Sequence, residues 1–310
     1  MISKSPSNTD KFKCHIEFTN SAREGWGMIL KTLQPDSEIL LPSYIGVTDR
    51  EGSGIYDPVI ESGVKHDFYL LNSDLSIPIS EIENKIKNKR YALILLVHYF
   101  GFKIQNIEDI VKLCKKHQII VVEDCAHLYN YNMFHISDAG TFGDLAFYSL
   151  HKNFALKNGG LLVRNNIEHL SIDNSGIDTA YGFSETLSAY RTDLIAKKRI
   201  DNFEFLDVLI SNIKSVKPLK KISKGDIPHN YPIIVKGNLR EKLYFWLIEK
   251  NITLIALYYR LIEPLQAKEY KEMQYVSNNI LNLPVHQDVE KKDLDILVKL
   301  IEEALVELDI

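Results

Sequence analysis

The chain has 310 residues, of which 45 % are hydrophobic and 25 % charged, as in ordinary globular proteins; this excludes intrinsic disorder, collagen and coiled coil. The formal net charge of −4 argues against a general nucleic-acid binder, which needs a basic surface to displace the counterions of phosphates. At roughly 150 residues per domain, the length predicts about two domains. The longest apolar stretch, residues 91–100, falls far short of the roughly 20 residues of a membrane span, so no membrane contact is expected.

The cysteines and the amino-terminal residues indicate a cellular compartment. Cys14, Cys114 and Cys125 form no CxxC pair, so neither a zinc ribbon nor a disulfide framework is predicted. Sparse cysteines fit a reducing compartment, and the first 18 residues contain no apolar run of the kind found in signal peptides. We therefore expect a cytoplasmic protein without a metal site.

The first half of the chain alternates helical and strand patterns. In chain order we expect a helix over 21–34, strands over 38–41 and 65–71, a helix over 80–88, a strand over 91–97, a helix over 107–114, and strands over 118–123, 145–149 and 161–164. The helix over 80–88 opens with the capping-box pattern Ser80-x-x-Glu83. Such alternation implies right-handed crossovers and an α/β fold, in which helices sandwich a mostly parallel central sheet.

The second half has a different pattern, typical of a smaller α+β domain. We expect a long helix over 184–213, a strand over 231–235, a helix over 239–250, a strand over 252–255, and a carboxyl-terminal helix with an apolar stripe at Leu294, Leu297, Ile301, Leu305 and Leu308. We place the boundary near residue 195, which gives a large domain over 1–195 and a small domain over 196–310. The basic run at 217–224 (KPLKKISK) is interpreted as a solvated loop, with a polyanion site as the alternative.

Three features of the first half point to one kind of site. No GxGxxG or GxxxxGK[ST] fingerprint follows a predicted strand, so a dinucleotide or nucleoside triphosphate is not favoured. Asp124 instead ends a buried strand, and Lys152 follows the end of another strand 28 residues later, before Gly159 and Gly160. Ligands of such sheets bind beyond the carboxyl ends of the strands. A partly desolvated lysine there can be pushed toward its neutral, nucleophilic form.

This combination suits pyridoxal 5′-phosphate (PLP). PLP needs a lysine for its Schiff base and a carboxylate beside its pyridine nitrogen. Its phosphate needs N–H donors, which the start of the helix over 21–34 offers, where Ser21-x-x-Glu24 forms a second capping-box pattern. We therefore predict that Asp124 and Lys152 share one cofactor.

The chain resembles the DegT/DnrJ/StrS family of PLP-dependent sugar aminotransferases. The stretches that carry the resemblance are NSAREGWGMILKTL (20–33), ILLPSYIGV (39–47), YDPVIESGVKHDFYLLN (56–72), VHYFGF (97–102), IIVVEDCAH (119–127), GTFGDLAFYSLHK (140–152), NGGLLV (158–163) and LPVH (283–286). The resemblance implies the fold of type I PLP-dependent transferases. It implies an aminotransferase, acting as a homodimer, that converts a nucleotide-linked keto sugar to an amino sugar with an amino-acid donor, glutamate.

The resemblance also implies roles for individual residues. Lys152 would form the Schiff base with PLP and later move the proton, and Asp124 would pair with the pyridinium nitrogen. His127 would lie near the 3-hydroxyl of the cofactor, and Tyr44 would stack on its ring. Ser149, Ser21 and Ala22 would bind the phosphate. In this chain only Leu150 and His151 separate Ser149 from Lys152, a shorter gap than is usual in the family, and Lys157 is a competing lysine in the same loop.

Two alternatives to the aminotransferase remain open. One is a PLP-dependent sugar dehydratase or epimerase, because relatives that dehydrate replace the lysine by histidine and His151 precedes Lys152. The other is a non-catalytic or regulatory protein on the same scaffold, suggested by the shortened second half and by the lack of the family's Asn-x-Arg residues around 182–186.

Overall fold

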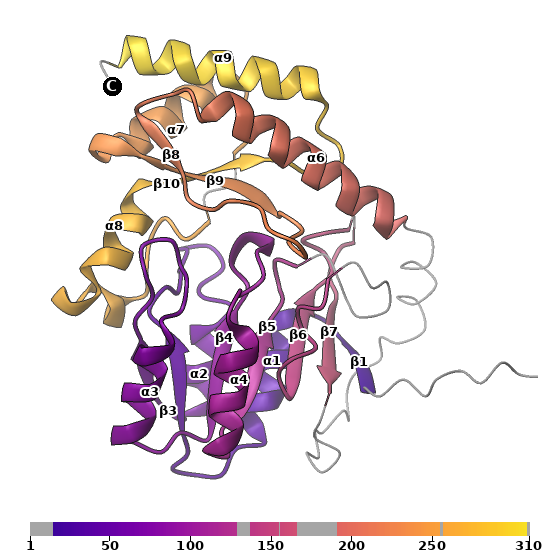
Figure 1. The fold of residues 1–310 in the computed structure, drawn as a ribbon, viewed down its shortest axis with the longest axis vertical. Coiled ribbons are helices and arrows are strands. Elements are labelled where there is room, and N and C mark those ends of the chain that lie inside the picture. The colour runs from indigo at the N-terminus through magenta and orange to yellow at the C-terminus, as the bar shows by residue number, and fades with distance from the viewer. Residues whose placement is uncertain (1–14, 129–136, 155, 166–190, 255–256, 309–310) are drawn as a thin grey trace, which may run out of the picture.

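The computed structural model describes residues 15–128, 137–154, 156–165, 191–254 and 257–308. These residues form a seven-stranded and a three-stranded sheet. Figure 1 shows the larger sheet with its helices in the lower part, and the smaller sheet with α6, α7 and α9 above it. Among the described residues, no helix has both the length and the apolar character needed to cross a membrane.

The large sheet is built from β1 (His15–Thr19), β2 (Glu38–Pro42), β3 (Lys65–Tyr69), β4 (Leu93–Val97), β5 (Ile120–Asp124), β6 (Leu145–Ser149) and β7 (Gly160–Arg164). Their order in space is β1-β7-β6-β5-β4-β2-β3. Strands β2 to β6 pair in parallel, whereas β7 runs antiparallel to both of its neighbours, β1 and β6. The mostly parallel sheet is therefore confirmed.

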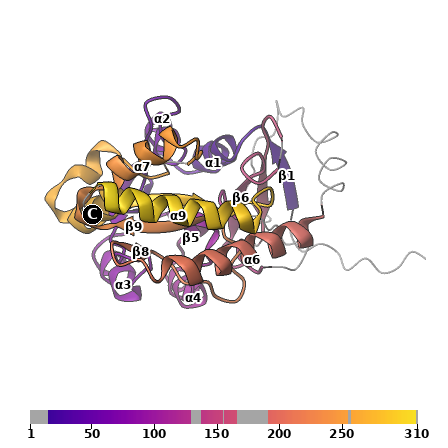
Figure 2. The same cartoon turned by 90° about the horizontal axis from the view of Figure 1, so that it is seen from above.

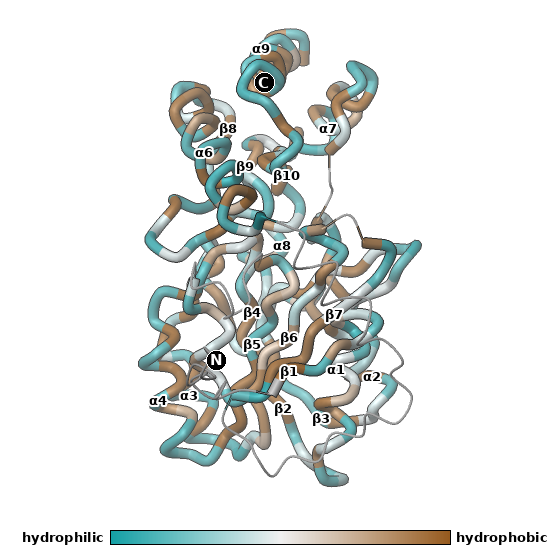
Figure 3. Tube along the Cα trace, turned by 90° about the vertical axis from the view of Figure 1, so that its right-hand side faces the viewer, coloured by the Kyte–Doolittle hydropathy of each residue, from teal (hydrophilic) through white to brown (hydrophobic). Residues whose placement is uncertain are grey.

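Helices cover both faces of this sheet. The helices on it are α1 (Ala22–Lys31), α2 (Tyr56–Ser62), α3 (Ile79–Asn88) and α4 (Ile107–Lys116), and a single 3₁₀ turn, η1 (Tyr99–Gly101), follows β4. Figure 2 shows α1 and α2 on one side of the strands and α3 and α4 on the other. Strand β4 is buried along its whole length, as expected for a parallel strand covered on two faces. The hydropathy colouring of Figure 3 shows apolar strands in the interior, while polar and apolar residues alternate along the helices.

The second half forms an antiparallel sheet with helices packed on it. Its strands are β8 (Val216–Pro218), β9 (Asn230–Val235) and β10 (Ile280–Pro284), in the order β10-β9-β8. Its helices are α6 (Thr192–Ile210), α7 (Arg240–Glu249), α8 (Lys271–Asn279) and α9 (Lys291–Glu307), with short 3₁₀ turns η3 (Lys236–Asn238), η4 (Glu263–Gln266) and η5 (Lys268–Tyr270). The small α+β unit is thus confirmed, whereas the predicted boundary at residue 195 falls within α6 and stays a prediction.

Two local expectations are wrong. Helix α3 begins at Ile79 with Pro78 as its N-cap residue, and no side chain caps it, so the capping box at Ser80 is not formed. Residues 252–254 form no strand, and Ile255 lies outside the described residues. The reason lies at the end of α7, where Asn251 adopts a left-handed conformation and the Ile252 N–H donates to the Leu247 carbonyl. This Schellman-type ending uses the N–H group that a strand would need.

Candidate active site

A cavity of about 550 Å³ opens at the carboxyl ends of the central strands. It is bounded by the start of α1, the segment between β2 and α2, and the ends of β4, β5 and β6. Leu257 and Tyr258, which precede the small sheet's last strand, complete it. Six of the predicted site residues line it: Ser21, Ala22, Asp124, His127, Ser149 and Lys152.

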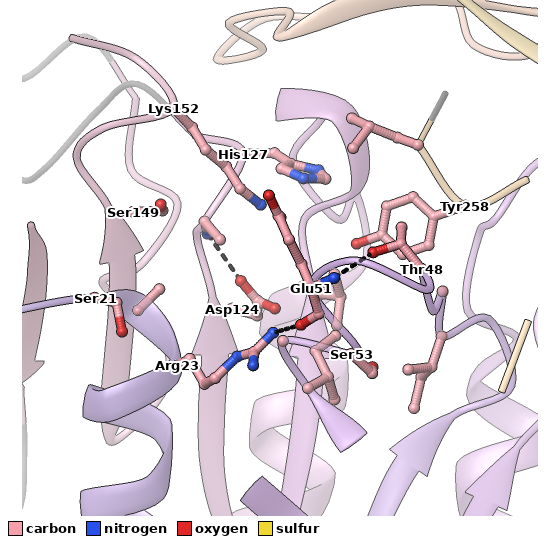
Figure 4. A pocket seen from close by; sticks show the side chains of 18 of the residues that line it. Ser21, Arg23, Thr48, Glu51, Ser53, Asp124, His127, Ser149, Lys152 and Tyr258 are labelled. Carbon is pink, nitrogen blue, oxygen red and sulfur yellow. Dashed lines mark hydrogen bonds between the residues drawn. The ribbon is translucent and has the colours of Figure 1, made fainter. Parts of the chain in front are cut away.

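Asp124 and Lys152 reach this cavity from neighbouring strands. Asp124 is the last residue of β5 and is paired in register with Phe147 on β6. Strand β6 ends at Ser149, and Lys152 follows three residues later. The Asp124 carboxylate accepts a hydrogen bond of 2.8 Å from the Ala126 N–H. Figure 4 shows the Lys152 amine and the Asp124 carboxylate in the same space.

Burial sets the proton affinities of this pair. The Lys152 side chain keeps accessible surface because it projects into the cavity, but protein surrounds it. Desolvation therefore lowers the pKa of Lys152, while the charges of Asp124 and Glu51 oppose the shift. Desolvation also raises the pKa of Asp124, against the hydrogen bond from Ala126 and the charge of Lys152. A lysine with a lowered pKa carries more of the neutral amine that acts as a nucleophile.

The amino-terminal end of α1 forms one wall of the cavity. Ser21 is the N-cap residue, and its hydroxyl accepts a hydrogen bond from the Glu24 N–H. The Glu24 carboxylate accepts from the Asn20 N–H at 2.6 Å, one residue before the position expected for a capping box. The N–H groups of Ala22 and Arg23 belong to the first turn, where helix geometry leaves N–H groups for other acceptors. This end of α1 is therefore suited to an anion.

Gly160 explains how α1 comes so close to the large sheet. A Cβ atom at residue 160 would lie 2.5 Å from the carbonyl carbon of Ser21 and 2.7 Å from the nitrogen of Ala22. Glycine is therefore required where β7 passes the first turn of α1. Ser149, which is almost fully buried, is paired with Gly160 across β6 and β7 and so lies beside the same helix end.

His127 is held as a neutral imidazole. Its Nδ1 accepts a hydrogen bond of 3.2 Å from the Phe100 N–H, which leaves the proton on Nε2. Burial and the charge of Lys152 lower the pKa of His127 well below its ordinary value. His229 directly precedes β9, and its ring stacks on the His127 ring with centroids 5.1 Å apart and planes 3° from parallel. Segments from both sheets therefore fix this imidazole.

The structure does not bring Tyr44 to the cavity. Tyr44 is fully buried and stacks on Tyr258, with ring centroids 5.1 Å apart, and Tyr258 lines the cavity instead. Gly46 makes room for this arrangement, because a Cβ atom there would lie 2.9 Å from the Tyr258 ring. Tyr258 is adjacent in space but 214 residues away in sequence, and no local pattern could have indicated it.

Lys157, the competing lysine, is exposed and does not line the cavity. Ser149 does line it, and its hydroxyl lies 3.4 Å from Nδ1 of His151. The shortened gap therefore still leaves Ser149, His151 and Lys152 around one cavity. The residues around 182–186, where the family's Asn-x-Arg was missing, lie outside the described residues.

Glu51 and Arg23 are cavity residues that the sequence did not single out as a pair. The Thr48–Gly52 turn is closed by two backbone hydrogen bonds, of 3.0 and 3.1 Å. Arg23 donates to the Glu51 carbonyl at 2.5 Å and forms a 3.6 Å ion pair with Asp57. Figure 4 shows the Glu51 side chain directed toward Lys152. The turn is thus tied to the start of α1, and it places a carboxylate at the lysine.

His98 also lines the cavity, directly after β4. Its Nε2 lies 2.8 Å from the Glu123 carboxylate, and its Nδ1 accepts from the Ile104 N–H. Glu123 further accepts hydrogen bonds from the N–H groups of Gly140, Phe142 and Gly143. His98, Glu123 and Cys125 lie close enough together that they could hold a metal ion. Because the Glu123 carboxylate already accepts from four donors, we assign this buried group a structural role instead. The rule that singled out Asp124, a polar residue at a strand end, would also have found His98.

Comparisons with known proteins agree with this geometry. The model of the DegT/DnrJ/EryC1/StrS aminotransferase family matches residues 57–174. A GDP-perosamine synthase of Escherichia coli O157:H7 is 27 % identical over 226 residues. The match covers 65 % of this chain and 61 % of that relative, which is less than two thirds of the relative's length. A dTDP-3-amino-3,6-dideoxy-alpha-D-galactopyranose transaminase of Aneurinibacillus thermoaerophilus is 24 % identical over 293 residues, 84 % of this chain and 77 % of the relative.

Solved structures share the fold over nearly the whole chain. A DegT DnrJ EryC1 StrS aminotransferase from Brucella abortus has a TM-score of 0.73 at 17 % identity, covering 93 % of this chain and 85 % of its own. NtdA from Bacillus subtilis, solved with the bound cofactor PMP, has a TM-score of 0.74 at 17 % identity, covering 94 % of this chain and 73 % of its own. The predicted fold of type I aminotransferases is confirmed. Residues 57–174 therefore match the model of the DegT/DnrJ/EryC1/StrS aminotransferase family, and the chain shares its fold with solved aminotransferases.

Proposed function

We propose that this protein is a PLP-dependent aminotransferase that converts a nucleotide-linked keto sugar to an amino sugar. The observation that carries the proposal is the pairing of Asp124 with Lys152 in one cavity that also contains the start of α1. The family match and the sugar transaminases among the relatives support the substrate class.

The residues present fit the cofactor. Asp124 is a buried carboxylate with a raised pKa, which a cationic pyridine ring beside it would stabilise in the charged form. The contact that only a glycine at residue 160 permits forms a cradle at Ser21 and Ala22, where N–H groups are available to a phosphate. Ser149 would add a hydroxyl, and Arg23 a positive charge, to the same end of the cavity.

When bound, PLP supplies an electron-withdrawing ring that stabilises negative charge on the carbon attached to the reacting nitrogen. Asp124 would keep the ring nitrogen protonated and so maintain that capacity. Lys152 would hold the cofactor through Nζ and would move a proton at that atom, as general base and then general acid. His127 would donate from Nε2 to the cofactor, because its Nδ1 already accepts from the Phe100 N–H.

The proposal extends to the donor, the assembly and the location. Glutamate as amino donor and a symmetric homodimer rest on the resemblance to the family. A cytoplasmic location agrees with Cys114 and Cys125, which are both free and buried. The domain limits of 1–195 and 196–310 stay part of the proposal.

The test is an absorbance titration of the full chain. PLP should give a visible band, glutamate should bleach it, and a nucleotide-linked keto sugar should restore it. With ¹⁵N-glutamate, the label should appear in the sugar. A deoxysugar without the label would support a dehydratase, for which His151 in the cavity is the one favourable observation. A folded protein that binds no PLP would contradict the proposal and support a non-catalytic role.

A further inference from the structure

A second cavity, of about 800 Å³, lies apart from the candidate active site. One wall comes from the end of α6, strand β8 and the segment that follows it, and the other from residues after β3 and η1. No residue that lines it also lines the active-site cavity. Its charged lining residues are Asp74, Lys103, Asp207, Lys214, Lys217, Lys220, Lys221, Asp226 and Lys236.

The lining of this cavity is strongly basic. It contains six lysines and three aspartates, in a chain whose net charge is −4. The segment between Asp207 and Asp226 contains five lysines and no acidic residue. Four of these five, Lys214, Lys217, Lys220 and Lys221, line the cavity. Positive charge is thus concentrated on one wall, where the ammonium groups repel one another unless an anion is present.

The three aspartates are already committed to other donors. Asp226 accepts hydrogen bonds of 2.8 Å from the Lys103 N–H and 2.7 Å from the Ser223 N–H. Asp74 accepts from the N–H and the hydroxyl of Ser76, and Asp207 accepts from the hydroxyl of Tyr231 at 2.7 Å. Lys103 pairs with Asp138. Over the described ranges, none of the four lysines from the 214–221 segment has a carboxylate oxygen within 4.0 Å.

Lys220 is the lysine that is most affected by the lack of a nearby carboxylate. It is half-buried, and desolvation lowers its pKa, although the more distant charges of Asp74 and Asp226 oppose the shift. An ammonium that has lost water without gaining a close counter-charge is destabilising. A bound anion would restore the lost interaction.

We propose that this cavity binds a small anion that carries a diphosphate group. Ammonium groups bind phosphate as compact point charges, and several of them on one wall fit an anion with more than one phosphate. The cavity volume is within the range of ordinary small-ligand sites. The segment interpreted from sequence as a solvated loop is therefore assigned its alternative role, a polyanion site.

The test is calorimetric titration of the full chain with inorganic pyrophosphate and, separately, with guanosine diphosphate. In addition to any anion held at the start of α1, one saturable site that belongs to this cavity is expected, and raising the salt concentration should weaken it. Replacing exposed lysines of the segment in the double variant Lys217→Gln/Lys221→Gln should weaken binding by at least about tenfold, because it removes two of the positive charges that attract the anion. Equal affinity for both ligands assigns recognition to the diphosphate, and tighter binding of guanosine diphosphate adds a nucleoside contact.

Two control variants make the result decisive. Lys292→Gln/Lys299→Gln removes two exposed lysines from α9 and should leave the affinity unchanged. Arg23→Gln changes the active-site cavity, where it should weaken anion binding, and should leave the affinity of the second cavity unchanged. The proposal is overturned if binding does not saturate, if the α9 variant loses as much affinity as the cavity variant, or if only Arg23→Gln abolishes binding. None of these outcomes depends on whether the protein is an aminotransferase.

Discussion

Gly160 on β7 lies against Ser21 so closely that a Cβ atom at residue 160 would be 2.5 Å from the Ser21 carbonyl carbon. This contact brings the amino-terminal end of α1 to the end of β6 and the start of β7, beside Ser149. Gly160, which the sequence shows only as the second residue of a Gly-Gly pair, therefore shapes the proposed phosphate site.

Gly160→Ala should destabilise the protein by about 1–3 kcal/mol, because the Ser21 and Ala22 atoms that a Cβ would meet belong to the backbone and cannot turn away. It should also weaken PLP binding, since α1 must move from the sheet. Urea unfolding and a PLP titration measure the two effects. Gly27→Ala, within α1, is the control. Its Cβ would meet only Pro58, at 4.0 Å, so it should be neutral or stabilising by roughly 0.5–1 kcal/mol. Equal behaviour of the two variants would contradict the account of Gly160.

Glu51→Gln should shift the pH dependence of PLP capture to lower pH. The Glu51 carboxylate favours the charged form of Lys152 and so raises its pKa; without it the neutral amine appears at lower pH. Arg23 acts in the opposite direction, so Arg23→Gln should shift the profile to higher pH. Stopped-flow rates of band formation, measured against pH, give the midpoints. Glu61→Gln, at an exposed position of α2, should leave the midpoint in place, and a Glu51→Gln midpoint equal to that of the parent would remove Glu51 from this role.

Glu123→Gln should destabilise the fold by roughly 3 kcal/mol, although the change is nearly isosteric. The carboxylate accepts from three backbone N–H groups and lies 2.8 Å from His98, and an amide NH₂ in its place would face donors. Urea unfolding measures the change, with Glu302→Gln on the exposed face of α9 as the control. A cost below about 0.5 kcal/mol, the usual limit for surface changes, would show that the network contributes little.

The sequence predicted six of the seven strands of the large sheet, all except β1, and the positions of Asp124 and Lys152 after strand ends, because these depend on local signals. Apolar runs such as residues 93–97 indicate buried strands, and the residue at the end of such a strand reaches the ligand crevice. Tyr258 was missed because only the folding of the second half brings it onto Tyr44. No pattern around either tyrosine encodes that contact.

The two wrong predictions of local structure also have physical causes. Ser80 and Glu83 have the spacing of a capping box, but α3 starts one residue earlier, after Pro78, and Glu81 instead accepts a hydrogen bond from the Leu70 N–H. Residue 252 is apolar and β-branched, yet its N–H is taken by the end of α7. At α7 a backbone hydrogen bond takes the N–H group that a strand would use, and at α3 Pro78 occupies the N-cap position two residues before Ser80.

The most direct test of the central claim is reductive trapping of the PLP-loaded protein with borohydride, followed by peptide mass spectrometry. The account predicts that the cofactor's mass is found on the peptide at Lys152, and that Lys152→Ala abolishes both this adduct and the visible band while Lys157→Ala keeps them. An adduct at Lys157, or a visible band that persists unchanged in Lys152→Ala, would contradict it.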